Sequence, residues 1–178
     1  GFPNGYAIMA VDAGVQNADG TTNRARWVHL PWNDTDPADR VMIEPSFFLF
    51  EAAVAWALGL PQPTKIYDLR PEPGGFLPTN TPISFLVDKQ TAAGSPVQIS
   101  GIRLRINGMD VTSQASVTDA GNRWQVTYNV PLEANRMYVI VASATAADGG
   151  FSARQTEIDT FDLANYTFEA EDFNFTDP

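Results

Sequence analysis

Glycine-containing turns divide residues 61–163 into short apolar segments, and this regular division restricts the fold more than any other feature of the sequence. The turns lie at 73–75, 93–95, 107–108, 120–122 and 148–150. The segments between them predict strands at 65–69, 82–87, 101–106, 111–118, 123–130, 137–145 and 151–161. Short strands with turns at intervals of about 8–12 residues are typical of β-sandwiches. The sequence therefore predicts a mainly β chain built around an antiparallel β-sandwich.

The polarity of these segments alternates with the period of a β-strand. In the segment 101–106, Ile102, Leu104 and Ile106 fall on one face, while Arg103 and Arg105 fall on the other. The segment 123–130 repeats the pattern, with the apolar residues Trp124, Val126 and Tyr128. Successive side chains of a strand point to opposite faces, so each strand has one buried and one hydrated face. This alternation predicts two sheets packed face to face.

Two stretches of the same region resemble bacterial immunoglobulin-like and fibronectin-type-III-like modules. The stretch 131–150 has the leucine, short turn, Tyr138, alternating valines and closing Asp-Gly of the E–F corner and F strand of such modules. The stretch 106–113, Ile-Asn-Gly-Met-Asp-Val-Thr-Ser, resembles one of their hairpins. The resemblance implies an immunoglobulin-like sandwich over 61–163, in which the Tyr138 hydroxyl bonds to the upstream backbone. This fold hosts many unrelated functions, so the resemblance by itself implies no activity.

Residues 1–60 have a different pattern, with two strand candidates and one helix. The apolar runs 6–12 and 26–30 predict strands that are separated by a polar, glycine-containing loop. A helix is predicted from Pro45, which suits the first turn, to Leu58, with Gly59 as the cap that follows it. Only Ser46 and Glu51 are polar in this helix, so several of its faces need to be covered. Residues 1–60 do not supply enough protein to cover them.

The same segment resembles the C-terminal end of class I amidotransferase-like α/β domains of the trehalose-utilisation type. The resemblance rests on Asn23-Arg-Ala-Arg-Trp-Val-His-Leu-Pro-Trp32, an acidic loop, and Leu49-Phe-Glu-Ala-Ala-Val-Ala-Trp-Ala-Leu-Gly59. It covers only the last part of such a domain and includes no nucleophile or catalytic histidine motif. It therefore implies a partial α/β segment at 1–60 and no activity.

Charge is distributed unevenly along the chain, whose net charge is −10. Residues 1–60 sum to −4, residues 61–154 to +1, and residues 155–178, which have no basic residue, to −7. The end of the chain, 164–178, is therefore interpreted as an acidic solvated tail. Its string Phe168-Glu-Ala-Glu-Asp-Phe173 also resembles the first strand of galactose-binding-like carbohydrate-binding modules, a resemblance that implies Glu169 and Glu171 in a calcium site that this chain does not complete. A strand that pairs with another molecule's sheet is a third interpretation.

The composition excludes several classes of chemistry. The chain has no cysteine, which excludes thiol nucleophiles, disulfides, iron–sulfur clusters and thiolate zinc sites. No cluster of Lys and Arg provides an electrostatic footprint for nucleic acid. No apolar run is long enough to span a membrane. We therefore expect no nucleic-acid partner, no membrane span and no cofactor.

The residues that could act in catalysis or metal binding each have a simpler interpretation, as structural or solvated residues. His29, the single histidine, has no second histidine and no cysteine with which to share a metal or a proton relay, so we expect a structural role. An acidic loop lacks the glycine and the closing glutamate of an EF-hand, so we expect it to be solvated. The carboxylates of this loop are Asp34, Asp36 and Asp39.

Tryptophans and sequons are the remaining candidates for contact with sugars. The chain has four tryptophans, of which periodicity places Trp56 and Trp124 in cores and leaves Trp32 as the one expected to be exposed as a stacking platform. Three Asn-x-Thr sequons matter only if the host glycosylates such sites. They begin at Asn33, Asn165 and Asn174. We assign no catalytic, cofactor-binding or metal-binding residue.

Together these features predict a non-catalytic fragment of a large secreted or cell-surface multidomain bacterial protein that is associated with carbohydrate. The sandwich at 61–163 would space the partial domain at 1–60 from a module that begins in 164–178. Its partners would be neighbouring modules or copies of itself, with a glycan as a further ligand. An alternative is a self-assembling structural or adhesive subunit that uses strand addition. A third is a fragment of an amidotransferase-like enzyme, which no nucleophile motif supports.

Overall fold

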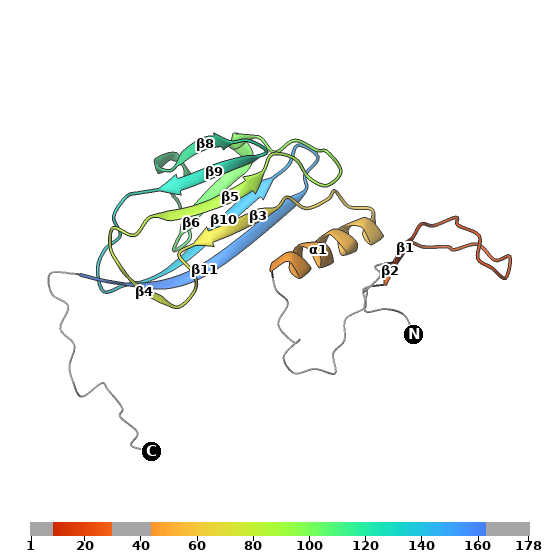
Figure 1. The fold of residues 1–178 in the computed structure, drawn as a ribbon, viewed down its shortest axis with the longest axis horizontal. Coiled ribbons are helices and arrows are strands. Elements are labelled where there is room, and N and C mark those ends of the chain that lie inside the picture. The colour runs from red at the N-terminus through yellow and green to blue at the C-terminus, as the bar shows by residue number, and fades with distance from the viewer. Residues whose placement is uncertain (1–8, 30–43, 163–178) are drawn as a thin grey trace, which may run out of the picture. The chain divides into compact units, whose positions relative to one another are not determined.

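The computed structural model describes residues 9–29 and 44–162, and Figure 1 labels its elements. Strands β1 (Met9–Val11) and β2 (Trp27–His29) pair antiparallel, with Ala10 opposite Val28, and form an N-terminal ribbon. Helix α1 (Glu44–Leu58) comes next in the chain. Strands β3 to β11 then form two larger sheets.

The order of the strands in these two sheets defines the fold. One sheet has the order β3 (Ile66–Arg70), β5 (Ile83–Asp88), β9 (Arg123–Tyr128) and β8 (Ser116–Ala120). The other has the order β4 (Gly75–Pro78), β11 (Phe151–Phe161), β10 (Met137–Thr145), β6 (Ile102–Ile106) and β7 (Met109–Asp110). In an immunoglobulin domain, strands A, B, E and D form one sheet and strands C, F and G form the other. Strands β3, β5, β9 and β8 match the first set, and β6, β10 and β11 match the second, so the predicted immunoglobulin-like β-sandwich is confirmed.

Side chains that alternate along both sheets form the core of the sandwich. Ile102, Leu104 and Ile106 are 0%, 1% and 4% exposed, whereas Arg103 and Arg105 between them are exposed. This alternation confirms the prediction for β6. The four-stranded sheet contributes fully buried side chains, which are Ile66, Ile83, Phe85, Val87 and Val126.

A tyrosine corner closes the turn before β10. The Tyr138 hydroxyl accepts a hydrogen bond from the Glu133 backbone N–H at 2.9 Å and lies 3.3 Å from the Glu133 carbonyl oxygen, to which it donates. Its side chain is 8% exposed. The bond from the corner tyrosine to the upstream backbone, which the sequence predicts, is therefore present.

Helix α1 ends where the sequence predicts. Gly59 has a φ of +68°, a left-handed conformation that glycine adopts without the steric cost of a side chain. The Gly59 N–H donates to the Trp56 carbonyl at 3.1 Å, and the Leu60 N–H donates to the Ala55 carbonyl at 2.9 Å. These two bonds form a Schellman motif, which satisfies the last carbonyls of the helix.

The single strand predicted at 111–118 is wrong. The structure instead has β7, then a short 3₁₀ helix (Thr112–Gln114), then β8 in the other sheet. The Asp110 carboxylate accepts a hydrogen bond from the Thr112 N–H at 2.9 Å, and the Thr112 hydroxyl accepts one from the Leu104 N–H at 2.8 Å. Such side-chain bonds to the backbone compete with a strand ladder and turn the chain towards the second sheet.

Strand β4 is not predicted from the sequence pattern. It pairs with β11 in parallel, with Phe76 opposite Asp159. Its first residue is Gly75 and its last is Pro78, residue types that are confined to strand ends, bulges and sheet edges. The local pattern therefore indicates a turn, and only pairing with the distant β11 makes the segment a strand.

The chain divides into two compact units that do not follow the sequence order. Of the described residues, one unit combines 9–29, 44–65, 88–101 and 144–152, and the other combines 66–87, 102–143 and 153–162. The first unit contains the ribbon, α1 and the turn between β10 and β11. The second contains most of both sheets.

Candidate interaction surface

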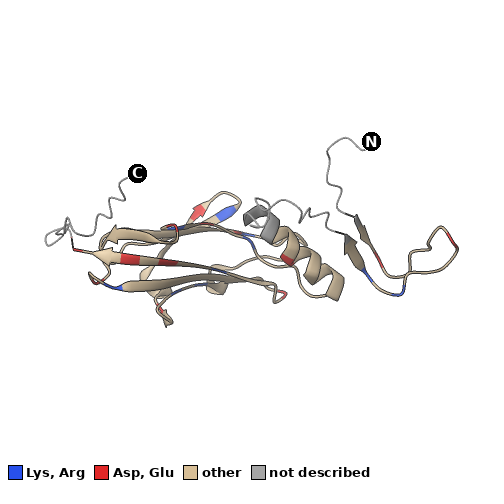
Figure 2. Ribbon diagram, turned by 90° about the horizontal axis from the view of Figure 1, so that it is seen from below, with Lys and Arg blue, Asp and Glu red and all other residues tan. Residues whose placement is uncertain are grey.

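Helix α1 exposes a stripe of large apolar side chains. Phe50, Val54 and Leu58 are 39%, 41% and 67% exposed, and their spacing of four residues places them on one face of the helix. Phe48 and Ala55, by contrast, are buried. In Figure 2 the segment 48–58 of the helix is tan apart from one red position, because Glu51 is its one charged residue. The helix therefore carries an apolar face that the described part of the chain leaves in contact with solvent.

Beside this stripe lies an open groove with a volume of about 470 Å³. Its walls come from α1, from the linker that follows the helix, and from the start of β11. Most of its lining is apolar, and Glu51 supplies its one charge. The lining residues are Phe50, Glu51, Val54, Ala55, Leu60, Pro61, Pro63, Gly149 and Phe151.

The linker wall of the groove is held against the turn between β10 and β11. The Thr64 hydroxyl donates a hydrogen bond to the Ala144 carbonyl at 3.0 Å, and Thr64 is completely buried. A Cβ added at Gly150 would lie 2.0 Å from the Gln62 carbonyl oxygen, so the two backbones are in close contact. This contact requires glycine at position 150 and fixes the linker in place.

Arg26 joins the ribbon to the C-terminal end of α1. Its guanidinium group donates to the Trp56 carbonyl at 3.1 Å and lies 5.2 Å from the centre of the Trp56 ring. It also forms an ion pair with Asp12 at 3.0 Å. Arginine over an indole ring is a favourable cation–π arrangement, so one face of Trp56 is occupied by Arg26.

The tryptophan predictions are wrong in two respects. Trp56 and Trp124 are half-buried and are not part of the fully buried core. Trp27 is 41% exposed, although we expect Trp32 to be the exposed one from the sequence. Trp27 lies on a two-stranded ribbon, which has too few strands to cover both of its faces.

Several candidate residues lie outside the described residues, so their predicted roles stay predictions. They are Trp32, Asn33, Asp34, Asp36, Asp39, Asn165, Glu169, Glu171 and Asn174. His29 is the last residue of β2 and pairs with Met9 in the register of the ribbon. Within residues 9–29 and 44–162, no group of three or more His, Cys, Asp or Glu side chains is arranged to hold a metal ion. No helix in these ranges is long and apolar enough to cross a membrane.

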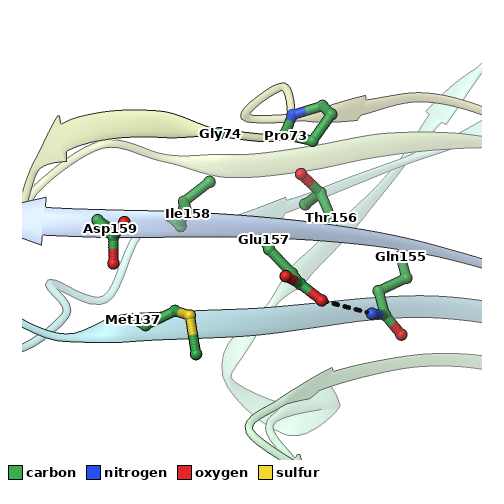
Figure 3. A pocket seen from close by; sticks show the side chains of 8 residues that line it. All are labelled: Pro73, Gly74, Met137, Gln155, Thr156, Glu157, Ile158 and Asp159. Atoms are coloured by element: carbon green, nitrogen blue, oxygen red, sulfur yellow. Dashed lines mark hydrogen bonds between the residues drawn. The ribbon is translucent and has the colours of Figure 1, made fainter.

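A second hollow, of about 410 Å³, lies over strand β11 in the five-stranded sheet (Figure 3). Glu157 and Asp159 project from β11, and Met137 projects from the neighbouring β10. The Glu157 carboxylate accepts a hydrogen bond from the Gln155 side chain at 3.0 Å. Sequence reasoning missed both hollows, because each joins segments that are far apart in the chain. The one signal for the groove is the lack of a polar face on α1.

Comparisons with known proteins find distant structural matches. No protein-family model matches the chain, and no curated protein matches it. The chain is similar to the crystal structure of an engineered protein, with 18% identity and a TM-score of 0.35, over 56% of this chain and 20% of that one. It is also similar to the N-terminal Ig1-2 module of the Drosophila receptor protein tyrosine phosphatase DLAR, with 19% identity and a TM-score of 0.37, over 59% of this chain and 52% of that one. The chain thus spans about a fifth and about half of these two solved chains. The immunoglobulin-like fold is assigned here from strand order and from the tyrosine corner.

Proposed function

We propose that this chain is a non-catalytic immunoglobulin-type module that spaces and presents other modules of a secreted multidomain bacterial protein. The observation that carries the proposal is the uncovered apolar groove beside the α1 stripe. In this proposal the sandwich at 61–163 is the folded spacer, and a neighbouring module of the same polypeptide covers the groove. The association with carbohydrate rests on the resemblance of the tail to a carbohydrate-binding module and is part of the same proposal.

Energetics suit a tethered neighbour, because a covalent connection lowers the cost of association. Fully burying one Leu, Val or Phe side chain contributes about 1.5–3 kcal/mol. The exposed residues Phe50, Val54, Leu58, Leu60 and Phe151 are already partly buried, so covering them contributes less than this for each. Association of two free molecules costs about 4–15 kcal/mol. A covalent connection raises the effective concentration of a neighbour and removes much of this cost, so a surface of this size suits a module on the same chain.

The proposal is tested with a dye whose fluorescence rises on exposed apolar surface, 1-anilinonaphthalene-8-sulfonate. We expect residues 1–178 to bind the dye, and the double variant V54S/L58S to bind clearly less. A matched control is M109S, which removes the exposed apolar side chain of β7 in the second unit and should leave most of the signal. A longer polypeptide from the same reading frame should bind less dye than residues 1–178. Unchanged dye binding in the longer polypeptide, or hydrolysis of a glycan by the purified chain, would contradict the proposal.

A self-assembling subunit that uses strand addition is the second candidate, and one observation favours it. Strand β8 is an edge of the four-stranded sheet, and four of its five residues are exposed. An open edge strand presents unpaired backbone groups to another strand. The remaining edges of the two sheets suit strand addition less, because β7 has two residues, β4 ends at Pro78, and the pairing of β3 is irregular between Tyr67 and Arg70. Sedimentation at rising concentration decides between the candidates, since strand addition produces a growing series of assemblies and a tethered spacer does not.

A further inference from the structure

The outward face of the five-stranded sheet separates its charges by strand. Glu157 and Asp159 are exposed on β11, and Arg103 and Arg105 are exposed on β6. Strand β10 lies between these two strands in the sheet. Its outward side chains in this region are apolar: Met137 is 61% exposed, and Val139 and Val141 are half-buried. On this face β11 is therefore an acidic strand, β10 an apolar one and β6 a basic one.

Hydrogen bonds fix where these charges lie along the strands. The Asn107 N–H donates to the Val139 carbonyl at 2.9 Å, which places the C-terminal end of β6 beside the start of β10. The Thr160 N–H donates to the Arg136 carbonyl at 3.0 Å, which places the end of β11 at the same level. Glu157 and Asp159 therefore lie near the start of β10, and Arg103 and Arg105 lie further along it. The acidic and basic groups occupy opposite corners of the face.

Within one molecule, each corner brings like charges together. Two residues that are two positions apart on a strand point to the same face and are separated by about 6.6 Å along the strand. This spacing places Glu157 and Asp159 on the same face of β11, and it places the two arginines on the same face of β6. Arg103 lies 3.8 Å from the Asp110 carboxylate on β7, which offsets part of the basic charge. An oppositely charged surface laid over either corner would relieve the repulsion there.

We propose that this face, defined by Arg103, Arg105, Met137, Val139, Val141, Glu157 and Asp159, binds a second copy of the same chain. In a dimer with a two-fold axis through the apolar centre, the acids of each copy face the arginines of the other. The same charge contact therefore forms twice. Such an interface is isologous, with Met137 and the two valines packed at its centre. The occupant is a second copy because the face carries both halves of the complementary charge pattern. A uniformly acidic or basic partner would be repelled by one corner.

The test uses the complete chain in analytical ultracentrifugation, at low salt and at 0.5 M NaCl. We expect a monomer–dimer equilibrium that weakens with salt, because exposed charge pairs are screened. The variants R103E/R105E and E157K/D159K should each raise the dimer dissociation constant at least about tenfold. Mixing the two variants in equal amounts should restore a dimer, because their reversed corners complement each other.

The matched control is S116E/T118E, which adds two acids to exposed positions of β8 in the other sheet and should leave the dimer intact. Circular dichroism checks that each variant is folded. If R103E/R105E is not folded, the single variant R105E replaces it, because R105E keeps the Arg103–Asp110 pair. A wild-type chain that stays monomeric at all concentrations would overturn the proposal. So would reversed variants that dimerise like the wild type, or a mixture that stays monomeric. If the chain instead dimerises through the groove or by strand addition, the charge-reversal variants should leave the dimer dissociation constant unchanged.

Discussion

Replacing Tyr138 with phenylalanine removes the tyrosine corner and little else. The hydroxyl that is lost accepts from the Glu133 N–H at 2.9 Å and donates to the Glu133 carbonyl at 3.3 Å. The ring stays in place, so the substitution opens no cavity in the core. A typical intramolecular hydrogen bond contributes about 0.5–1.5 kcal/mol net, so loss of both bonds should lower the free energy of unfolding by about 1–3 kcal/mol.

The assay for Y138F is equilibrium unfolding in urea, with the free energy extrapolated to water. The matched control is Y128F, because Tyr128 is also buried and its hydroxyl forms no hydrogen bond with a described residue. We expect Y128F to change the free energy of unfolding by less than about 0.5 kcal/mol. For a domain of about 100 residues, such as the sandwich at 61–163, each kcal/mol lost lowers Tm by about 4–8 °C. Thermal unfolding therefore provides a second readout. Equal stabilities of Y138F and Y128F would refute the reasoning that the corner bonds stabilise the sandwich.

Three further substitutions or conditions test other parts of the sandwich. F85A removes one of the largest fully buried side chains and should destabilise the chain by about 3–5 kcal/mol, whereas L86A on the outward face of the same strand should cost much less in the same urea assay. G101A places a Cβ 2.3 Å from the Thr145 carbonyl oxygen, and overpacking against backbone should cost about 1–3 kcal/mol; wild-type stability would contradict this contact. Burial raises the pKa of Tyr128 above its ordinary value of 10.0, with a smaller contribution from Tyr138. The unfolded chain therefore loses this proton first, and stability should fall as the pH rises above about 10; a Y128F variant with the same alkaline loss would contradict this cause.

Local signals in the sequence predict the elements whose structure depends on near neighbours. Tyr138 and Gly59 are found from short motifs, because a corner tyrosine and a helix cap each bond to backbone within five residues. Strands β10 and β11 have the predicted bounds because their alternation continues over 9 and 11 residues. Long, regular patterns and local hydrogen bonds are therefore read reliably from one sequence.

Contacts between separate segments of the chain determine the elements that the sequence does not predict. The 3₁₀ helix at 112–114 depends on a bond from Leu104 to Thr112, and β4 depends on pairing with β11. The groove joins α1 to Phe151, about 100 positions later in the chain. None of these features can be predicted from the sequence pattern within a window of a few residues.

We infer that the stability of the chain resides in the two-sheet sandwich, while α1 carries an uncovered surface for a neighbouring module. Native-state hydrogen exchange on residues 1–178 tests this claim most directly. We expect amides of β5, β6, β9 and β10 to share the largest free energy of opening, because these strands lie inside the sheets and carry fully buried side chains. We expect α1 amides to open at a clearly lower free energy, since the apolar stripe of α1 is exposed, and to become protected in a longer polypeptide of the same reading frame. Amides of α1 that open at the same free energy as those of β10 in residues 1–178 would contradict the claim.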